Sequence, residues 1–138
     1  STGIGTDNID IVVTELDALA NIDFATRTEK EQKKQLTLLR LGTSGALQPD
    51  IELGTFLFSR TSVGFDGLLN FYKGRNEVCA LPIEQSFIKH VGWSELLPKP
   101  YFIDADNSLF ELFKDTTREG ITIAAPGFYA PQGRWVRI

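Results

Sequence analysis

Two short segments of the sequence combine residue types that could bind and transform a small polar ligand. In the first, Arg40 lies in the apolar run 36–41 and directly precedes the turn Gly-Thr-Ser-Gly at 42–45. A buried guanidinium on a strand needs a negative partner, because a desolvated charge is costly unless it is paired. The glycines leave backbone N–H groups free and the hydroxyls of Thr43 and Ser44 add donors, so the segment predicts a phosphate site at the end of a strand. The alternative is a structural ion pair between Arg40 and a distant Asp or Glu.

The second segment is APGFYAPQGR, residues 125–134, which follows an apolar run. Phe128 and Tyr129 can offer a stacking face. Gln132 supplies both a donor and an acceptor, and Arg134 supplies a rigid fork of donors. Such a set suits a flat polar ring with adjacent carbonyl and N–H groups. The alternative is an aromatic turn that fills the core while Gln132 and Arg134 stay exposed.

Other chemically capable residues give weaker signals. His90 is the single histidine, lies in a stretch expected to be rich in loops, and has no neighbouring nucleophile pattern, so we interpret it as structural or superficial. Cys79 is the single cysteine, which excludes an internal disulfide, and it has no basic neighbour to favour a thiolate. No cluster with metal-ligand spacing is present, and we expect neither a metal nor a cofactor.

The elements that must position these residues follow from hydrophobic periodicity. Apolar positions at helical spacing predict a helix over about 8–21, with Thr6, Asp7 or Asn8 as its cap. We expect a solvated loop or a short exposed helix over 26–35, a buried parallel strand over 36–41 and a strand over 55–63. Pro82, Pro98 and Pro100 should break any long element over 64–108, so we expect loops and short strands there. We further expect a helix over 108–116, capped by Asn107 or Ser108, and a strand over 120–125. This order predicts one α/β domain over residues 1–138, with three αβα layers and a mixed sheet.

Composition limits the classes of partner. The 138 residues carry a formal net charge of −4 and are 42% hydrophobic, which suits one soluble globular domain and gives no long-range attraction for nucleic acid or an acidic membrane. The apolar runs are too short to span a bilayer, and a single cysteine fits a reducing cytoplasm. The chain opens on a glycine-rich turn without Met and stops in the alternating segment RWVRI, so we expect it to be truncated at both ends.

Three segments in this order resemble the nucleoside phosphorylase family that includes the uridine phosphorylases. STGIGTDNIDIVVTEL is similar to the family's Gly-x-Gly turn and following helix, although Asp7, Asn8 and Asp10 depart from its usual residues. RLGTSGALQPDIELG resembles the Arg-x-Gly-Thr-x-Gly segment, and APGFYAPQGR resembles the Phe-Tyr-x-x-Gln-x-Arg base pocket of the uridine-specific branch. The likeness extends over most of the chain, apart from 22–35 and 74–118.

The resemblance implies phosphorolysis of uridine, in which phosphate attacks the anomeric carbon to give ribose 1-phosphate and uracil. By this resemblance Arg40 and Thr43 are the catalytic residues. The implied phosphate contacts are Arg40, Gly42 and Thr43. The implied nucleoside contacts are Thr43, Ser44, Gly45, Phe128, Gln132 and Arg134, with Phe128 stacked on uracil and the last two residues reading its edge.

The family also uses an upstream phosphate loop, a downstream Glu-Met-Glu segment and residues of a neighbouring subunit. We therefore expect a homo-oligomer, a dimer or a hexamer, and expect the 138-residue chain alone to be inactive. The alternatives are a purine nucleoside phosphorylase, a nucleosidase on the same fold, and a non-catalytic nucleoside-binding domain.

Overall fold

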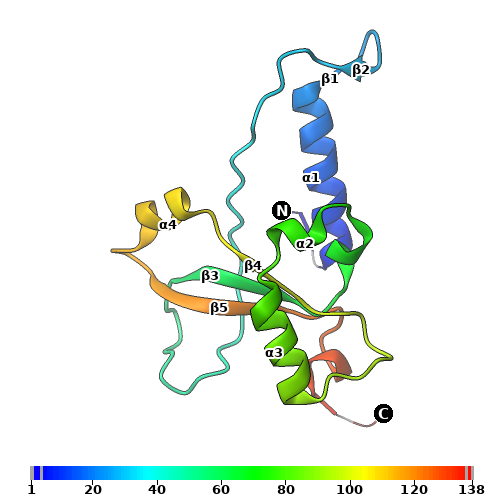
Figure 1. Cartoon of the computed structure of the whole chain (residues 1–138). Coiled ribbons are helices and arrows are strands. Elements are labelled where there is room, and N and C mark those ends of the chain that lie inside the picture. Colours follow the sequence, from blue (N-terminus) through cyan, green and yellow to red (C-terminus); the bar gives the residue numbers. More distant parts are fainter. Residues whose placement is uncertain (1, 4, 136, 138) are drawn as a thin grey trace. The chain divides into compact units, whose positions relative to one another are not determined.

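The computed structural model describes residues 2, 3, 5–135 and 137 and divides the chain into two compact units, 1–43 and 44–138 (Figure 1). The predicted single domain over 1–138 stays a prediction. Among the described residues no helix is both long and apolar enough to cross a membrane.

The first unit is built on a helix and a small hairpin. Helix α1 spans Thr6–Asn21 and confirms the helix predicted over 8–21. Its N-cap is Gly5, at φ 100°, where no side chain caps the helix, so the predicted cap at 6–8 is wrong. Strands β1 (Ile22–Asp23) and β2 (Thr28–Glu29) pair antiparallel, and β2 lies within the segment 26–35 that was predicted to be a loop or a short helix.

A buried amide ties the polar segment after this hairpin to α1. The Asn21 side chain accepts a hydrogen bond from the Lys34 backbone N–H at 2.7 Å and donates to the Lys34 carbonyl at 3.1 Å. It also donates to the Asp17 carboxylate at 2.7 Å. Asn21 is only 7% exposed, and a buried amide is stable only when its donors and acceptor are paired. The polar 22–35 segment thus has a defined anchor, which its composition did not reveal.

Residues 36–41 are not the buried strand that their apolar run predicts. They have no regular secondary structure, and Leu41 is 87% exposed. A strand exists only where a neighbour completes its ladder of hydrogen bonds. Within the described part of the first unit, only β1 and β2 are paired, so 36–41 lacks such a neighbour.

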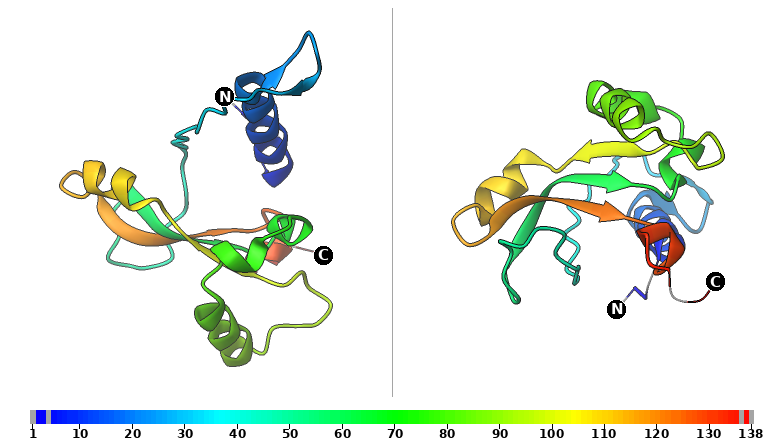
Figure 2. Two further views of the ribbon diagram at one scale, coloured as in Figure 1. Left: turned by 45° about the horizontal axis from the view of Figure 1, so that its top comes forward. Right: turned by 90° about the horizontal axis from the view of Figure 1, so that it is seen from below.

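The second unit is organised by a three-stranded mixed sheet of order β4-β3-β5 (Figure 2). Strand β3 (Leu57–Gly64) runs parallel to β5 (Arg118–Ala124) and antiparallel to β4 (Tyr101–Asp104). The two predicted strands at 55–63 and 120–125 are therefore confirmed. The predicted α/β class with a mixed sheet is confirmed as well.

Helices and short turns connect these strands. Between β3 and β4 the chain forms η1 (Leu68–Phe71), α2 (Arg75–Val78) and α3 (Leu81–Val91), and between β4 and β5 it forms α4 (Asn107–Phe113). The expectation of only loops and short strands over 64–108 is wrong at α3. Pro82 lies in the first turn of this helix, where the missing N–H costs no helical hydrogen bond. Helix α4 is capped by the Asp106 side chain rather than by Asn107 or Ser108.

The core of this unit is small and aromatic. Val63 and Phe102 are paired across β3 and β4 and are 3% and 6% exposed. Phe87 of α3 contacts Phe102 and Phe65, and Trp93 packs on both Phe65 and Phe87. A second cluster joins α4 to β3 through Phe58, Phe110 and Phe113. These two clusters attach α3 and α4 to the sheet.

Candidate functional site

The segment predicted to bind phosphate is exposed. Arg40, Gly42 and Thr43 belong to the first unit and have no regular secondary structure, whereas Ser44 and Gly45 begin the second unit and are exposed too. The prediction that Arg40 is buried on a core strand is therefore wrong. The cause is the missing strand ladder over 36–41, because an unpaired segment does not exclude water from its side chains.

The Arg40 guanidinium lies against the backbone of Gly42. A Cβ added at Gly42 would meet Nη1 of Arg40 at 3.1 Å and its Cζ at 3.3 Å. Among the described residues no carboxylate forms an ion pair with Arg40, so the structural ion pair that the sequence left open is not seen there. Arg40 thus has its donors available, and glycine at position 42 permits the close approach.

The aromatic and polar segment 125–134 directly follows β5 and folds into a tight loop. The Tyr129 carbonyl accepts hydrogen bonds from the backbone N–H groups of Gln132 at 2.9 Å and Arg134 at 3.0 Å. Gly133 between them has φ 71°, a conformation that favours glycine. One carbonyl therefore fixes the backbone positions from which Gln132 and Arg134 extend.

The side chains on this loop are exposed and partly stacked. Cζ of Arg134 lies 4.7 Å from the centroid of the Phe128 ring, and Nη1 donates to the Phe128 carbonyl at 3.4 Å. Phe128 is 65% exposed and Tyr129 is 62% exposed, with their rings edge to face. Gln132 is exposed as well. The loop does not fill the core, so the alternative interpretation of an aromatic core turn is wrong.

The loop leaves the sheet at the edge where ligands usually bind in open α/β sheets. Because β3 and β5 are parallel, their carboxyl ends at Gly64 and Ala124 lie side by side, and they form one of the register pairs. The Phe65 N–H extends this pairing with a 2.8 Å hydrogen bond to the Ala124 carbonyl. The loop 125–134 therefore starts beside the chain that leaves β3.

A tyrosine fixes the chain where it leaves β3. The Tyr101 hydroxyl donates to both oxygens of Asp66, at 2.8 and 3.0 Å, while Asp66 also accepts from the Leu68 N–H. A Cβ on Gly64 would lie 2.0 Å from the Tyr101 ring, so only glycine fits beneath it. Burial, together with the Asp66 carboxylate, raises the pKa of Tyr101 well above its usual range. Tyr101 therefore remains a hydrogen-bond donor at neutral pH.

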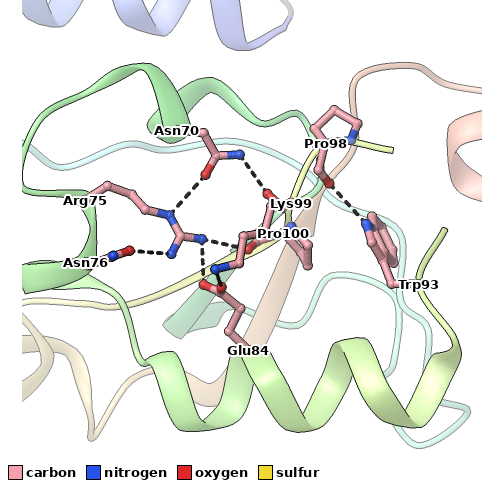
Figure 3. A network of polar contacts seen from close by, with 8 residues as sticks. All are labelled: Asn70, Arg75, Asn76, Glu84, Trp93, Pro98, Lys99 and Pro100. Carbon is pink, nitrogen blue, oxygen red and sulfur yellow. Dashed lines mark hydrogen bonds and ion pairs between the residues drawn. The ribbon is translucent and has the colours of Figure 1, made fainter. Parts of the chain in front are cut away.

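A buried ionic network stabilises the long connection from β3 to β4 (Figure 3). Glu84 of α3 is fully buried, and its carboxylate meets Nη2 of Arg75 and Nζ of Lys99, each at 2.6 Å. The Arg75 guanidinium also donates to Asn70, to Asn76 and to the Pro100 carbonyl. The network joins η1, α2, α3 and the segment that enters β4.

Sequence reasoning missed this network. Arg75 and Glu84 are nine positions apart, and the contact of Arg75 with the Pro100 carbonyl arises only after the chain folds. Neither residue belongs to a recognisable motif. Of the two weaker candidates, His90 is exposed but lies on α3 and not in a loop, and Cys79 is half-buried. No group of three or more potential metal ligands is found among the described residues.

Comparison with known proteins shows the family of the chain. A model of the phosphorylase superfamily matches residues 1–137. The chain belongs to this superfamily. Comparison with curated proteins gave no match.

Among solved structures, the fold is similar to that of a nucleoside phosphorylase from Trypanosoma brucei, with a TM-score of 0.77 and 22% sequence identity. The match covers 99% of this chain and 51% of the other, so the chain spans about half the length of that protein. The trypanosome protein shows uridine phosphorylase activity. For the present chain, the match establishes the fold.

Proposed function

We propose that this chain carries the phosphate-binding and base-binding segments of a nucleoside phosphorylase that converts uridine and inorganic phosphate to uracil and ribose 1-phosphate. The observation that carries the proposal is the loop 125–134. It holds an exposed aromatic ring, an amide and a guanidinium on one tight turn at the carboxyl end of β5. Membership of the phosphorylase superfamily and the activity stated for the trypanosome relative support it.

The chemistry assigns a role to each part of the loop. Phosphate attacks C1′ of the ribose, the bond from C1′ to N1 of the base breaks, and its electron pair passes to the base. Gln132 and Arg134 donate hydrogen bonds to the base as this negative charge develops, and such donors accelerate the step because they bind the transition state more strongly than the substrate. The departing uracil then takes up a proton.

The attacking phosphate needs binding partners of its own. Arg40 and Thr43 hold the phosphate with the backbone of Gly42, and Thr43, Ser44 and Gly45 border the ribose. A fixed cation beneath the sugar holds the nucleophile in line with C1′, which removes much of the entropic cost of bringing two reactants together. Arg40 has no carboxylate partner among the described residues, which leaves its charge available for phosphate.

The proposal also covers the cofactor requirement, the oligomeric state and the cellular location of the enzyme. No cofactor is required besides the co-substrate phosphate, the active form is a cytoplasmic homo-oligomer, and the isolated 138-residue chain turns over no nucleoside. Detectable uracil release by the isolated chain, purified free of host phosphorylase, would contradict the last point.

The decisive experiment incubates the intact protein with uridine or inosine, each with and without phosphate, and measures free base. Release of uracil that depends on phosphate is expected, and Arg40→Gln should abolish it while the exposed control Arg27→Gln should not. Release of hypoxanthine instead would indicate a purine enzyme, and release without phosphate would indicate a nucleosidase. Uridine binding with no release would indicate a non-catalytic module.

A further inference from the structure

We propose that the Phe128 ring has two successive partners, the Arg134 guanidinium in the free protein and the pyrimidine ring in the complex, and that this exchange favours bases with carbonyl oxygens. The inference rests on the proposed function. The observation behind it is the stack of Arg134 on Phe128, with 4.7 Å between Cζ and the ring centroid. A second contact, from Nη1 to the Phe128 carbonyl, holds the guanidinium at 3.4 Å.

The guanidinium occupies the space that a stacked base needs. A planar ring that packs on Phe128 places its centroid about 4.5–7 Å from that of the phenyl ring, which overlaps the layer that Arg134 now fills. To read a carbonyl of the base, the guanidinium must instead lie beside the base, near its plane. Arg134 cannot meet both conditions at once.

The base takes the face that Arg134 now covers. A base on the opposite face would be separated from the guanidinium by the Phe128 ring itself, and Arg134 could not reach its edge. The Arg134 backbone is held by the Tyr129 carbonyl at 3.0 Å, so the exchange is a side-chain movement about a fixed backbone. The contact at 3.4 Å is long for an N–H to O hydrogen bond and is therefore released at little cost.

The exchange acts as a selection step. Every ring that stacks on Phe128 must displace a cation from an exposed aromatic face, which lowers its affinity by about 2- to 5-fold. A ring with a carbonyl oxygen gives the displaced guanidinium a new acceptor, and this restores the loss. A ring that only stacks leaves Arg134 without a partner. The loop thus prefers uracil-like bases over flat rings that lack a carbonyl oxygen.

The test follows the Arg134 δ-methylene protons by NMR in the intact protein, because protons above an aromatic ring resonate upfield. In the free protein the upfield shift is expected in the wild type, lost in Phe128→Leu, and kept in Phe71→Leu, which changes an exposed ring elsewhere. Saturation with uracil is expected to abolish the shift in the wild type as well.

Each alternative result has a distinct meaning. If the upfield shift persists while other resonances show that uracil is bound, the exchange is wrong and the proposed function stands. If uracil at millimolar concentration changes no resonance, the proposed function fails and the exchange fails with it. If Phe128→Leu leaves the shift of the free protein unchanged, the resting stack does not exist in solution and the inference is overturned.

Affinity gives an independent measure. Removal of the guanidinium in Arg134→Gln should weaken binding of uracil but strengthen binding of unsubstituted pyrimidine, a flat ring without carbonyl oxygens, by the same 2- to 5-fold. A variant that binds both rings more weakly would overturn the selection step, because Arg134 would then assist stacking instead of competing with it.

Discussion

Two arginines of the second unit differ in how far the fold itself satisfies their hydrogen-bond donors. Arg75 is 9% exposed, and its guanidinium is shared among Glu84, two asparagine side chains and the Pro100 carbonyl. Arg134 is exposed and rests on Phe128 with one long hydrogen bond. The first has its donors satisfied by the fold, whereas the second leaves most of its donors exposed to solvent.

The difference has an energetic origin. A buried charge loses its hydration and must recover that loss from fixed partners, so removal of a partner destabilises the folded state. An exposed guanidinium remains hydrated, and its contact with an aromatic face contributes only about 0.5–1 kcal/mol. Substitutions in the two regions should therefore affect different observables: the free energy of unfolding near Arg75, and catalysis near Arg134.

The largest effect is expected from Glu84→Ala. This change leaves the buried Arg75 without its carboxylate, and loss of one partner of a buried ion pair costs about 3–5 kcal/mol. Urea denaturation should show a lower midpoint with little change in slope. Glu95→Ala, at an exposed glutamate, is the matched control and should shift the midpoint little. Equal shifts in the two variants would mean that the network adds nothing to stability.

The second effect concerns catalysis. Under the proposed function, Arg134→Gln removes a donor that meets charge on the departing base, and kcat should fall about 100-fold or more. The unfolding midpoint should stay within about 0.5 kcal/mol of the wild type, because the side chain is exposed. Phosphorolysis kinetics and urea denaturation of the same preparation separate an effect on kcat from an effect on stability. A lowered midpoint with unchanged kcat would reverse the assignment of the two arginines.

A third test concerns the carboxyl end of β3, where Gly64 lies against the ring of Tyr101. Gly64→Ala should destabilise the protein by about 1–3 kcal/mol, because the new methyl group would lie 2.0 Å from the Tyr101 ring and must displace it. At Gly45 an added Cβ meets nothing within 4 Å, so Gly45→Ala is the control. In a Tyr101→Ala background the cost of Gly64→Ala should disappear. A cost that remains there would locate the strain elsewhere.

The sequence predicted those elements whose signals are local. Helix α1 and strands β3 and β5 follow from apolar periodicity, and the loop 125–134 follows from its combination of aromatic and polar residues. Helix α3 was missed because Pro82 was interpreted as a breaker, although proline is well tolerated in a first turn. In each case the outcome depended on the few residues around the element.

The errors about burial concern contacts between distant parts of the chain. The apolar run 36–41 has the composition of a strand, but a strand also needs a neighbour, and composition does not supply one. The buried Arg75 likewise contacts the carbonyl of Pro100, which lies 25 positions away. A single sequence therefore identified the exposed arginine of the loop, whose neighbours are local, and missed the buried one, whose neighbours are not.

The smallest effect is expected from Tyr101→Phe, which removes the hydroxyl donated to Asp66. An intramolecular hydrogen bond contributes about 0.5–1.5 kcal/mol net, and the partial exposure of this pair keeps its contribution within that range although Asp66 is charged. The loss should depend on pH. The pKa of Tyr101 is raised in the folded state above its ordinary value of 10.0. The stability that the hydroxyl contributes is therefore complete below pH 10 and declines as the pH rises above it.

Urea denaturation between pH 8 and pH 12 measures this decline. The free energies of unfolding of the wild type and Tyr101→Phe should approach each other at the alkaline end. A constant difference across this range would mean that the phenol does not act through its proton, and that its ring on Gly64 is what fixes the turn.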